Sequence, residues 1–266
     1  MTAGYRLKFD RAGEHLLQRE SEVSDWFNGK NHRLIHEADP QCTDRINVRV
    51  VFLQSPPTDR WSITIGEILY NLRSCLDHIA FELNGRPHNA HYLSEFPIVG
   101  RENQFGKPDT NPNDAPRKFA EFVNRKLVGC KQPAVEAIEA MQPYKHALGY
   151  KEHPLWMLNF LCNMDKHRTL HVVTGVFEGF SDDAAMYPPP KTTGPVRQHM
   201  GSLEADTILL SYTPADQQNE MDIGFMPYFG IGITNWYGGH RSITGLLTCI
   251  RVFVCNNVIY PLSLLT

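Results

Sequence analysis

Apolar positions between residues 61 and 85 recur with the three- and four-residue spacing of one helical face. The stretch reads WSITIGEILYNLRSCLDHIAFELNG. Its apolar positions are Ile65, Ile68, Leu69, Leu72, Leu76, Ile79 and Leu83. Thr58 or Asp59 can cap the start of a helix, and Asn84-Gly85 is a common helix end. The pattern predicts a long, largely buried helix around which the rest of the chain is organised.

Polar side chains follow both edges of the apolar face of this helix. At about 100° per residue, Glu67, Asn71 and His78 fall along one edge. Arg73 and Asp77 fall along the other edge. Asn, Asp, Arg and His form directed hydrogen bonds, whereas an ordinary solvated edge carries Lys, Glu and Gln. The edges therefore belong to a functional site, or they hold an Arg73–Asp77 ion pair with His78 at the core boundary.

A second helix with a polar end is predicted from 154 to 171, PLWMLNFLCNMDKHRTLH. Pro154 suits the first position of a helix, and an apolar stripe follows it. The polar residues near its end are Asn163, Asp165, Lys166, His167, Arg168 and His171. A solvated charge run explains Lys and Arg, but it does not explain two histidines with an Asn and an Asp. We expect this helix to pack beside the helix at 61–85, which brings the two polar sets together.

The stretch from Arg73 to His78 has the R-x4-H form of the HEPN superfamily, which this part of the chain resembles. The pair NLRSCLDH and NMDKHR is also similar to a pair found in a family of bacterial, largely actinobacterial, proteins of unassigned function. HEPN proteins are helical bundles that include many metal-independent ribonucleases. The resemblance covers the bundle helices and implies RNA or a nucleotide as partner, with no metal or cofactor.

The remaining first part of the chain is predicted from periodicity and turn residues. A helix is expected over 5–28 and a β-hairpin over 32–37 and 46–53, where apolar and polar residues alternate in the second strand. Residues 86–116 form a long loop, for which we expect 96–98 to be the anchor. Short helices are predicted at 117–129 and 133–141.

After residue 168 the pattern changes to strands. Strands are predicted at 170–177, 203–212 and 221–234, with a surface excursion over 179–201. Ser242 caps a final helix to about Val258, which is apolar nearly all round and is therefore expected to be buried. The fold class is α+β: a HEPN-like helical bundle with an N-terminal hairpin, and a C-terminal antiparallel β part closed by the buried helix. The predicted domains are 1–168 and 169–266, packed as one unit.

Composition places the chain among soluble globular proteins. It has 266 residues, 42% hydrophobic and 21% charged, with a net charge of −3, so any contact with RNA must be local. No apolar stretch approaches 18 residues, so we expect no membrane span and no signal peptide. Six scattered cysteines without CxxC or zinc spacing favour a cytoplasmic protein with reduced thiols. A homodimer is a further expectation.

Three functions remain open. In a HEPN-like ribonuclease, Arg73 stabilises the transition-state phosphate and His78 is general acid or base, because the RNA 2′-OH supplies the nucleophile. His167 is a third catalytic candidate, and the expected binding residues are Asn71, Asp77, Asn163, Asp165, Lys166 and Arg168. In a small-molecule enzyme with a pocket between helices and sheet, the side chains that iron or zinc accepts are Glu67, His78, Asp165, His167 and His171. In a non-catalytic binding protein, the same polar groups form a buried network joining two helices.

Overall fold

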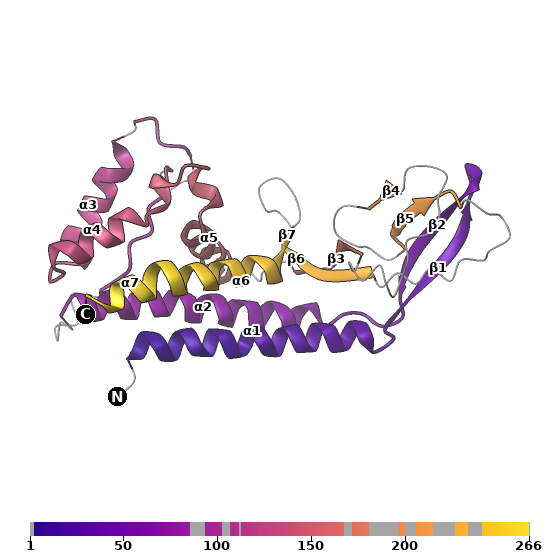
Figure 1. The fold of residues 1–266 in the computed structure, drawn as a ribbon, viewed down its shortest axis with the longest axis horizontal. Coiled ribbons are helices and arrows are strands. Elements are labelled where there is room, and N and C mark those ends of the chain that lie inside the picture. The colour runs from indigo at the N-terminus through magenta and orange to yellow at the C-terminus, as the bar shows by residue number, and fades with distance from the viewer. Residues whose placement is uncertain are drawn as a thin grey trace. The chain divides into compact units, whose positions relative to one another are not determined.

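The structure is a computed structural model (Figure 1). It describes residues 3–85, 94–102, 107–111, 113–167, 172–180, 197–199, 206–214, 227–233 and 241–265. The chain divides into two compact units. The helical unit is Met1–Leu17, Ile63–Leu170 and Leu246–Thr266, and the sheet unit is Gln18–Ser62 and His171–Gly245. This division differs from the predicted domains, because the hairpin groups with the later strands and most of the C-terminal helix groups with the other helices.

Helices and strands are both well represented, so the predicted α+β class is confirmed. In chain order the elements are α1 (Gly4–Asn28), β1 (His32–Asp39), β2 (Cys42–Phe52), α2 (Thr58–Leu83), α3 (Asp114–Lys126), α4 (Gln132–Ala140), two 3-10 turns (Pro143–Lys145 and Tyr150–Glu152), α5 (Pro154–His167), β3 (Val172–Phe180), β4 (Arg197–Gln198), β5 (Ile208–Tyr212), β6 (Pro227–Ile233), β7 (Arg241–Ser242), α6 (Ile243–Phe253), a π-helical turn (Val254–Ile259) and α7 (Tyr260–Ser263). The HEPN-like character of the bundle stays a prediction.

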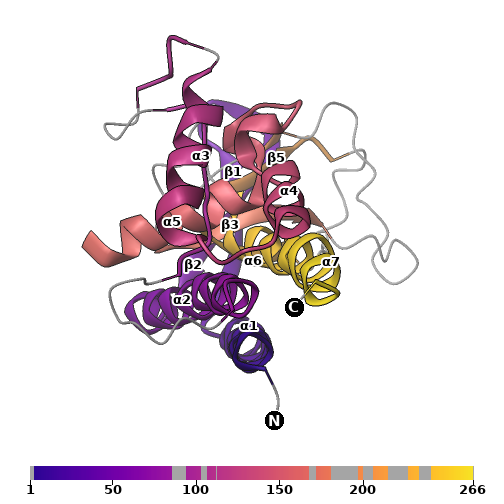
Figure 2. The same cartoon turned by 90° about the vertical axis from the view of Figure 1, so that its left-hand side faces the viewer.

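The helical unit packs around α2. All seven apolar positions predicted for its buried face are buried, with Leu83 the most exposed at 7%. The parts of α1 and α6 in this unit run alongside α2 (Figures 1 and 2). Helix α5 contacts α2 where the Cys162 thiol lies 3.5 Å from the Leu69 carbonyl oxygen, as expected from the sequence. Each fully buried Leu or Ile contributes about 1.5–3 kcal/mol to stability, so this face of α2 is a major part of the core.

The sheet unit holds two antiparallel sheets, with strand orders β1-β2-β5-β4 and β3-β6-β7. The predicted alternation in β2 holds only in part: Val48 and Val50 are buried and pack with residues of β5, but Asn47, which was predicted on the polar side, is buried as well. Val48 pairs with Leu210 in the register of β2 and β5. The hairpin therefore continues into the four-stranded sheet instead of standing as an insertion in the bundle.

The C-terminal helix was expected to be buried, and the structure buries it along one face only. Leu247, Ile250 and Val258 are fully buried, whereas Val252 is 50% exposed and Tyr260 is 70% exposed. The stretch Ile243–Ser263 is long and apolar enough to cross a membrane by length and composition, a test that the core helix of a soluble protein also passes. The structure continues helical past the predicted end through a π-helical turn and α7.

Candidate functional site

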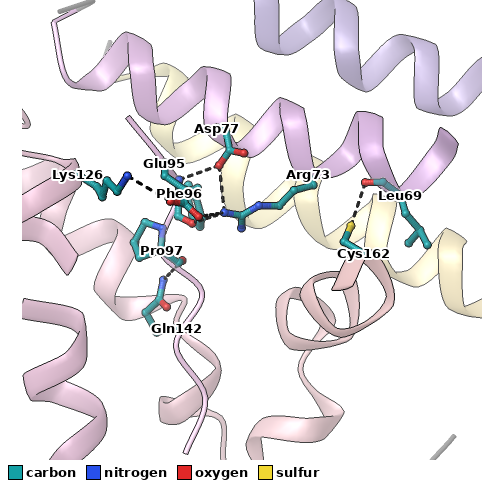
Figure 3. A network of polar contacts seen from close by, with 9 residues as sticks. All are labelled: Leu69, Arg73, Asp77, Glu95, Phe96, Pro97, Lys126, Gln142 and Cys162. Carbon is teal, nitrogen blue, oxygen red and sulfur yellow. Dashed lines mark hydrogen bonds and ion pairs between the residues drawn. The ribbon is translucent and has the colours of Figure 1, made fainter. Parts of the chain in front are cut away.

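Arg73 and Asp77 on α2 hold the segment 94–97 against that helix (Figure 3). Arg73 Nη2 donates to Glu95 Oε1 at 3.2 Å and to the Phe96 carbonyl oxygen at 3.0 Å. It also lies 3.2 Å from Asp77 Oδ1, which accepts the Phe96 N–H at 2.9 Å. Phe96 is fully buried, so this pair fixes the backbone around an apolar anchor. Buried peptide groups need such partners, and Arg73 and Asp77 supply them.

Arg73 and Asp77, called the clamp from here on, form a largely buried ion pair. Only 13% of the Arg73 side chain is exposed. Burial raises the pKa of Asp77, and the nearby Arg73 guanidinium and the Phe96 N–H partly offset that rise. Arg73 Nη1 is buried and has no hydrogen-bond partner in the described part of the chain. The observed contacts of Arg73 are therefore structural, and its predicted role in catalysis is not among them.

The segment held by the clamp is supported from its other side by a buried glutamine. Gln142 Nε2 donates to the Pro97 carbonyl oxygen at 3.0 Å, and its Oε1 accepts the Val99 N–H at 2.9 Å. The Val99 carbonyl oxygen accepts the N–H of Tyr144 at 3.1 Å. The expectation that residues 96–98 anchor the long loop agrees with these contacts.

The other polar edge of α2 lies along α1. Glu67 Oε2 lies 3.7 Å from His15 Nδ1, and Asn71 Oδ1 lies 3.5 Å from Lys8 Nζ. His78 continues the same edge toward the start of α1, where a Cβ added at Gly4 would lie 2.6 Å from its Nδ1. The prediction that Glu67, Asn71 and His78 lie along one edge of α2 therefore agrees with the structure.

His78 does not meet Arg73, because five residues on a helix correspond to about 140° of rotation. The side chain of His78 is exposed, and it lies seven residues beyond Asn71, about 10 Å along the helix axis. The structure thus places the two members of the R-x4-H pair on different faces of α2. Nothing in the geometry joins them into one constellation within this chain.

The polar end of α5 is only partly described. Asp165 is half-buried, whereas Asn163 and Lys166 are exposed. His167 is the last residue of α5, and its side chain lies outside the description. The predicted site residue Arg168 and the metal-ligand candidate His171 also lie outside the described residues.

Two of the predicted binding residues, Asn71 and Asp165, line one open cleft of about 670 Å³ between α1, α2 and the end of α5. The other side chains around it were not predicted, apart from Glu67 as a metal-ligand candidate. The full lining is Lys8, Arg11, His15, Ile63, Gly66, Glu67, Tyr70, Asn71 and Asp165. The cleft thus combines cationic, acidic and imidazole groups in one place, and these are groups that can contact a charged ligand.

On the α1 side of the cleft, His15 lies beside the Glu67 carboxylate, at 3.7 Å from Nδ1 to Oε2. Its side chain is 13% exposed, and its Nδ1 faces Glu67. Nε2 has no hydrogen-bond partner among the described residues. Lys8 approaches from the same helix, with its ammonium group 5.3 Å from the centre of the Tyr70 ring. Asn71 is held in turn, because its Nδ2 donates to the Glu67 carbonyl oxygen at 2.9 Å.

On the α5 side, Asp165 lies directly over Gly66. A Cβ at position 66 would lie 2.7 Å from Asp165 Oδ2, a distance that real Cβ atoms do not show. Glycine is therefore required for the carboxylate to approach the α2 backbone this closely. Burial raises the pKa of Asp165, so this carboxyl holds its proton to higher pH than an ordinary aspartate.

Two buried cysteines and the possible metal ligands can be assessed where the structure describes them. Burial raises the pKa of Cys75 and Cys162 to about 12, so neither is a thiolate at neutral pH. Within the described ranges, no group of three or more His, Cys, Asp or Glu side chains has an arrangement that would hold a metal ion.

A second cleft of about 580 Å³ lies between α3, α5 and residues 98–102. Its two acidic groups are already engaged. Glu102 Oε1 accepts from Trp156 Nε1 at 2.6 Å and its Oε2 accepts from the Tyr150 hydroxyl at 3.2 Å, while Glu121 pairs with Arg117 at 2.7 Å. Lys118 on its wall pairs with Asp109 at 2.6 Å. These contacts join the loop to the helices, so the first cleft is the better candidate for chemistry.

Sequence reasoning missed His15 and Lys8. The signal was present, because Lys8, Arg11 and His15 are spaced three and four residues apart on one face of α1. That face was recognisable as a site only once α1 was known to lie against the polar edge of α2.

Comparisons with known proteins add no relative to this picture. No family model matches the chain, and no curated protein or solved structure matches it.

Proposed function

We propose that the cleft binds a nucleotide or a short stretch of RNA and cleaves a phosphodiester bond by metal-independent acid–base catalysis. One observation carries the proposal: His15, which lies beside the Glu67 carboxylate, lines the same cleft as Asp165, a carboxyl whose pKa is raised by burial. An imidazole and a carboxyl that keeps its proton are side chains of the kinds that act as general base and general acid. Lys8 and Arg11 add the positive charge that a phosphate requires.

Each residue then has a defined step. His15 Nε2 accepts the proton of the ribose 2′-OH while the 2′ oxygen attacks the adjacent phosphorus. The protonated Asp165 carboxyl donates its proton to the departing 5′ oxygen. Lys8 stabilises the charge that develops on the phosphate oxygens. The products are a 2′,3′-cyclic phosphate and a free 5′-OH, so no metal or external nucleophile is needed.

The charge balance of the cleft limits the substrate. Its lining includes two cationic residues, Lys8 and Arg11, and two acidic residues, Glu67 and Asp165. With Asp165 ionised the four charges cancel, and with Asp165 protonated the cleft is net positive. Binding of an anionic ligand should therefore strengthen as the pH falls. This balance favours a dinucleotide or a short single strand over a long duplex, which needs an extended basic surface.

The proposal differs from the HEPN-like hypothesis in the residues that do the chemistry. The HEPN-like hypothesis assigns the reaction to Arg73 and His78, and ours assigns it to His15 and Asp165. Because His78 shares the α2 edge with Glu67 but is exposed and lies outside the cleft, it provides a matched control. Both hypotheses predict RNA cleavage, and they differ in which histidine substitution abolishes that cleavage.

The test is cleavage of a short mixed-sequence single-stranded RNA in EDTA, with an all-2′-deoxy strand as the uncleavable control. We expect His15→Ala and Asp165→Asn each to lower the rate by about 10²–10⁴-fold, the usual contribution of a general acid or base. His78→Ala should retain the wild-type rate. Loss of activity in His78→Ala but not in His15→Ala would assign the catalytic role to Arg73 and His78, the R-x4-H pair, instead of His15 and Asp165. Binding of the deoxy strand without any cleavage of RNA would make the protein a non-catalytic binder.

A further inference from the structure

Tyr70 is a large aromatic side chain that the fold leaves exposed at the rim of the cleft. It is 63% exposed, and Ile63, about two turns earlier on α2, is 64% exposed. Both line the cleft, and the α2 residues that do so lie on one helical face, at positions 63, 66, 67, 70 and 71. The neighbouring face of α2 is fully buried at 65, 68, 69 and 72. The helix is thus well packed, and its two exposed apolar side chains lie on the face that the cleft leaves open.

The ring of Tyr70 lies beside the cations of the cleft. Lys8 Nζ is 5.3 Å from the ring centre, and the same ammonium group is 3.5 Å from Asn71 Oδ1. Arg11, about one turn further along α1, lines the same cleft. Proteins hold single-stranded nucleic acids with this combination, because bases stack on aromatic rings while cations contact the phosphates. The charge distinguishes this rim from an exposed apolar patch that would suit a protein partner.

The ring is also close to the groups that we assign to the chemistry. Tyr70 follows Glu67 by three residues, so the two side chains are neighbours on the surface of α2. Glu67 in turn faces His15, at 3.7 Å. In the proposed reaction His15 and Asp165 act on the sugar and the phosphate, and neither contacts a base. A nucleotide whose sugar lies at His15 therefore has its base within reach of Tyr70.

We propose that Tyr70 is the base-stacking residue of this cleft, and that it holds one unpaired nucleobase while Lys8 contacts the adjacent phosphate. This inference rests on the proposed function of the cleft and adds the part of the substrate that the acid–base groups do not contact. Stacking tolerates every base, but it favours purines because their rings are larger. It also requires an unpaired base, since a base inside a duplex is covered on both faces. The substrate class is therefore single-stranded RNA with a purine preferred at the stacked position.

The test measures the binding of two short all-2′-deoxy strands of equal length and charge, which cannot be cleaved. One carries a single 2-aminopurine between abasic positions, and the other is fully abasic. Wild type should bind the first strand at least about tenfold more tightly and quench its 2-aminopurine fluorescence, as expected for one stacked base. Tyr70→Ala should bind the two strands equally, without quenching, and fold as stably as wild type because the side chain is exposed. Tyr70→Phe keeps the ring and should restore the preference and the quenching.

Tyr260→Ala is the matched control, because Tyr260 on α7 is 70% exposed and does not line the cleft. It should bind both strands as wild type does. Equal binding of the two strands by wild type, or an unchanged preference in Tyr70→Ala, would overturn the stacking role, even if the protein cleaves RNA as proposed above. A wild type that binds neither strand would also overturn it, and the proposed function falls as well only if RNA is not cleaved. A change of oligomeric state in Tyr70→Ala would make the ring a subunit contact instead.

Discussion

His153 caps α5 with a ring nitrogen, and acidification should remove that cap. Its Nδ1 accepts the N–H of Leu155 at 3.2 Å, which requires the imidazole to be neutral. The ring is 5% exposed and packs edge-on against Phe253, with ring centres 4.8 Å apart. Burial, assisted by the neighbouring His146, lowers the pKa of His153 to about 4. Protonation would therefore turn the acceptor into a donor and place a charge in an apolar setting.

The size and sign of the effect follow from this pKa. An unfolded histidine titrates near 6.5, so the folded value of about 4 is about 2.5 pH units lower, which corresponds to at most about 3 kcal/mol. Between these values the unfolded chain binds the extra proton. The contribution of His153 is thus fully present above about pH 6.5 and is lost as the pH falls through about 4.

The measurement is urea unfolding at a series of pH values for wild type and His153→Asn. Asparagine is a good helix N-cap that does not titrate, so the variant keeps a cap and removes only the protonation. The difference in unfolding free energy between the two proteins should change by about 2–3 kcal/mol between pH 7.5 and pH 4. His78→Asn, which replaces an exposed imidazole, controls for the loss of a histidine. Parallel pH profiles for wild type and His153→Asn would refute the capping argument.

Three further changes test the core, the clamp and the cleft. Leu72 is fully buried, so Leu72→Ala should lower the unfolding free energy by about 2–5 kcal/mol. His78 is exposed, so His78→Ala should cost less than about 0.5 kcal/mol. Equal losses for the two variants in denaturant unfolding would contradict the assignment of Leu72 to the core and His78 to the surface. Arg73→Met leaves the Asp77 carboxylate and the Phe96 carbonyl oxygen without the guanidinium and should destabilise by about 3–5 kcal/mol, and an unchanged melting temperature would show that the clamp is dispensable. Gly66→Ala should displace the Asp165 carboxylate and shift the pH dependence of RNA cleavage with little change in stability; an unaltered profile would exclude Asp165 as the acid.

Elements with long, regular patterns were predicted well. The apolar face of α2 and the start of α5 at Pro154 are local properties of the sequence, and the structure confirms both. The end of the last helix was not predictable in this way. Pro261 has no N–H to continue the helical ladder, and the chain passes through a π-helical turn at Val254–Ile259 before α7.

Long-range pairings were beyond a local reading. The hairpin joins the later strands because Val48 of β2 meets Leu210 of β5, more than 150 residues away in the chain. His15 was missed for the same reason, since it became a site residue only when α1 lay against Glu67. A pattern within one segment shows which face is polar, but it does not show what that face meets.

The two edges of α2 show why spacing alone misdirects the search for a site. Arg73 and His78 form a recognisable motif in the linear sequence, yet they point about 140° apart on the helix. One edge holds a loop in place through Arg73, and the other faces α1 and borders the cleft through Glu67 and Asn71. Residues that act together must share a face, so the informative spacing on α2 is the four residues from Glu67 to Asn71. The same rule applied to α1 selects Lys8, Arg11 and His15, which is why the chemistry of the cleft is best sought in residues that no linear motif connects.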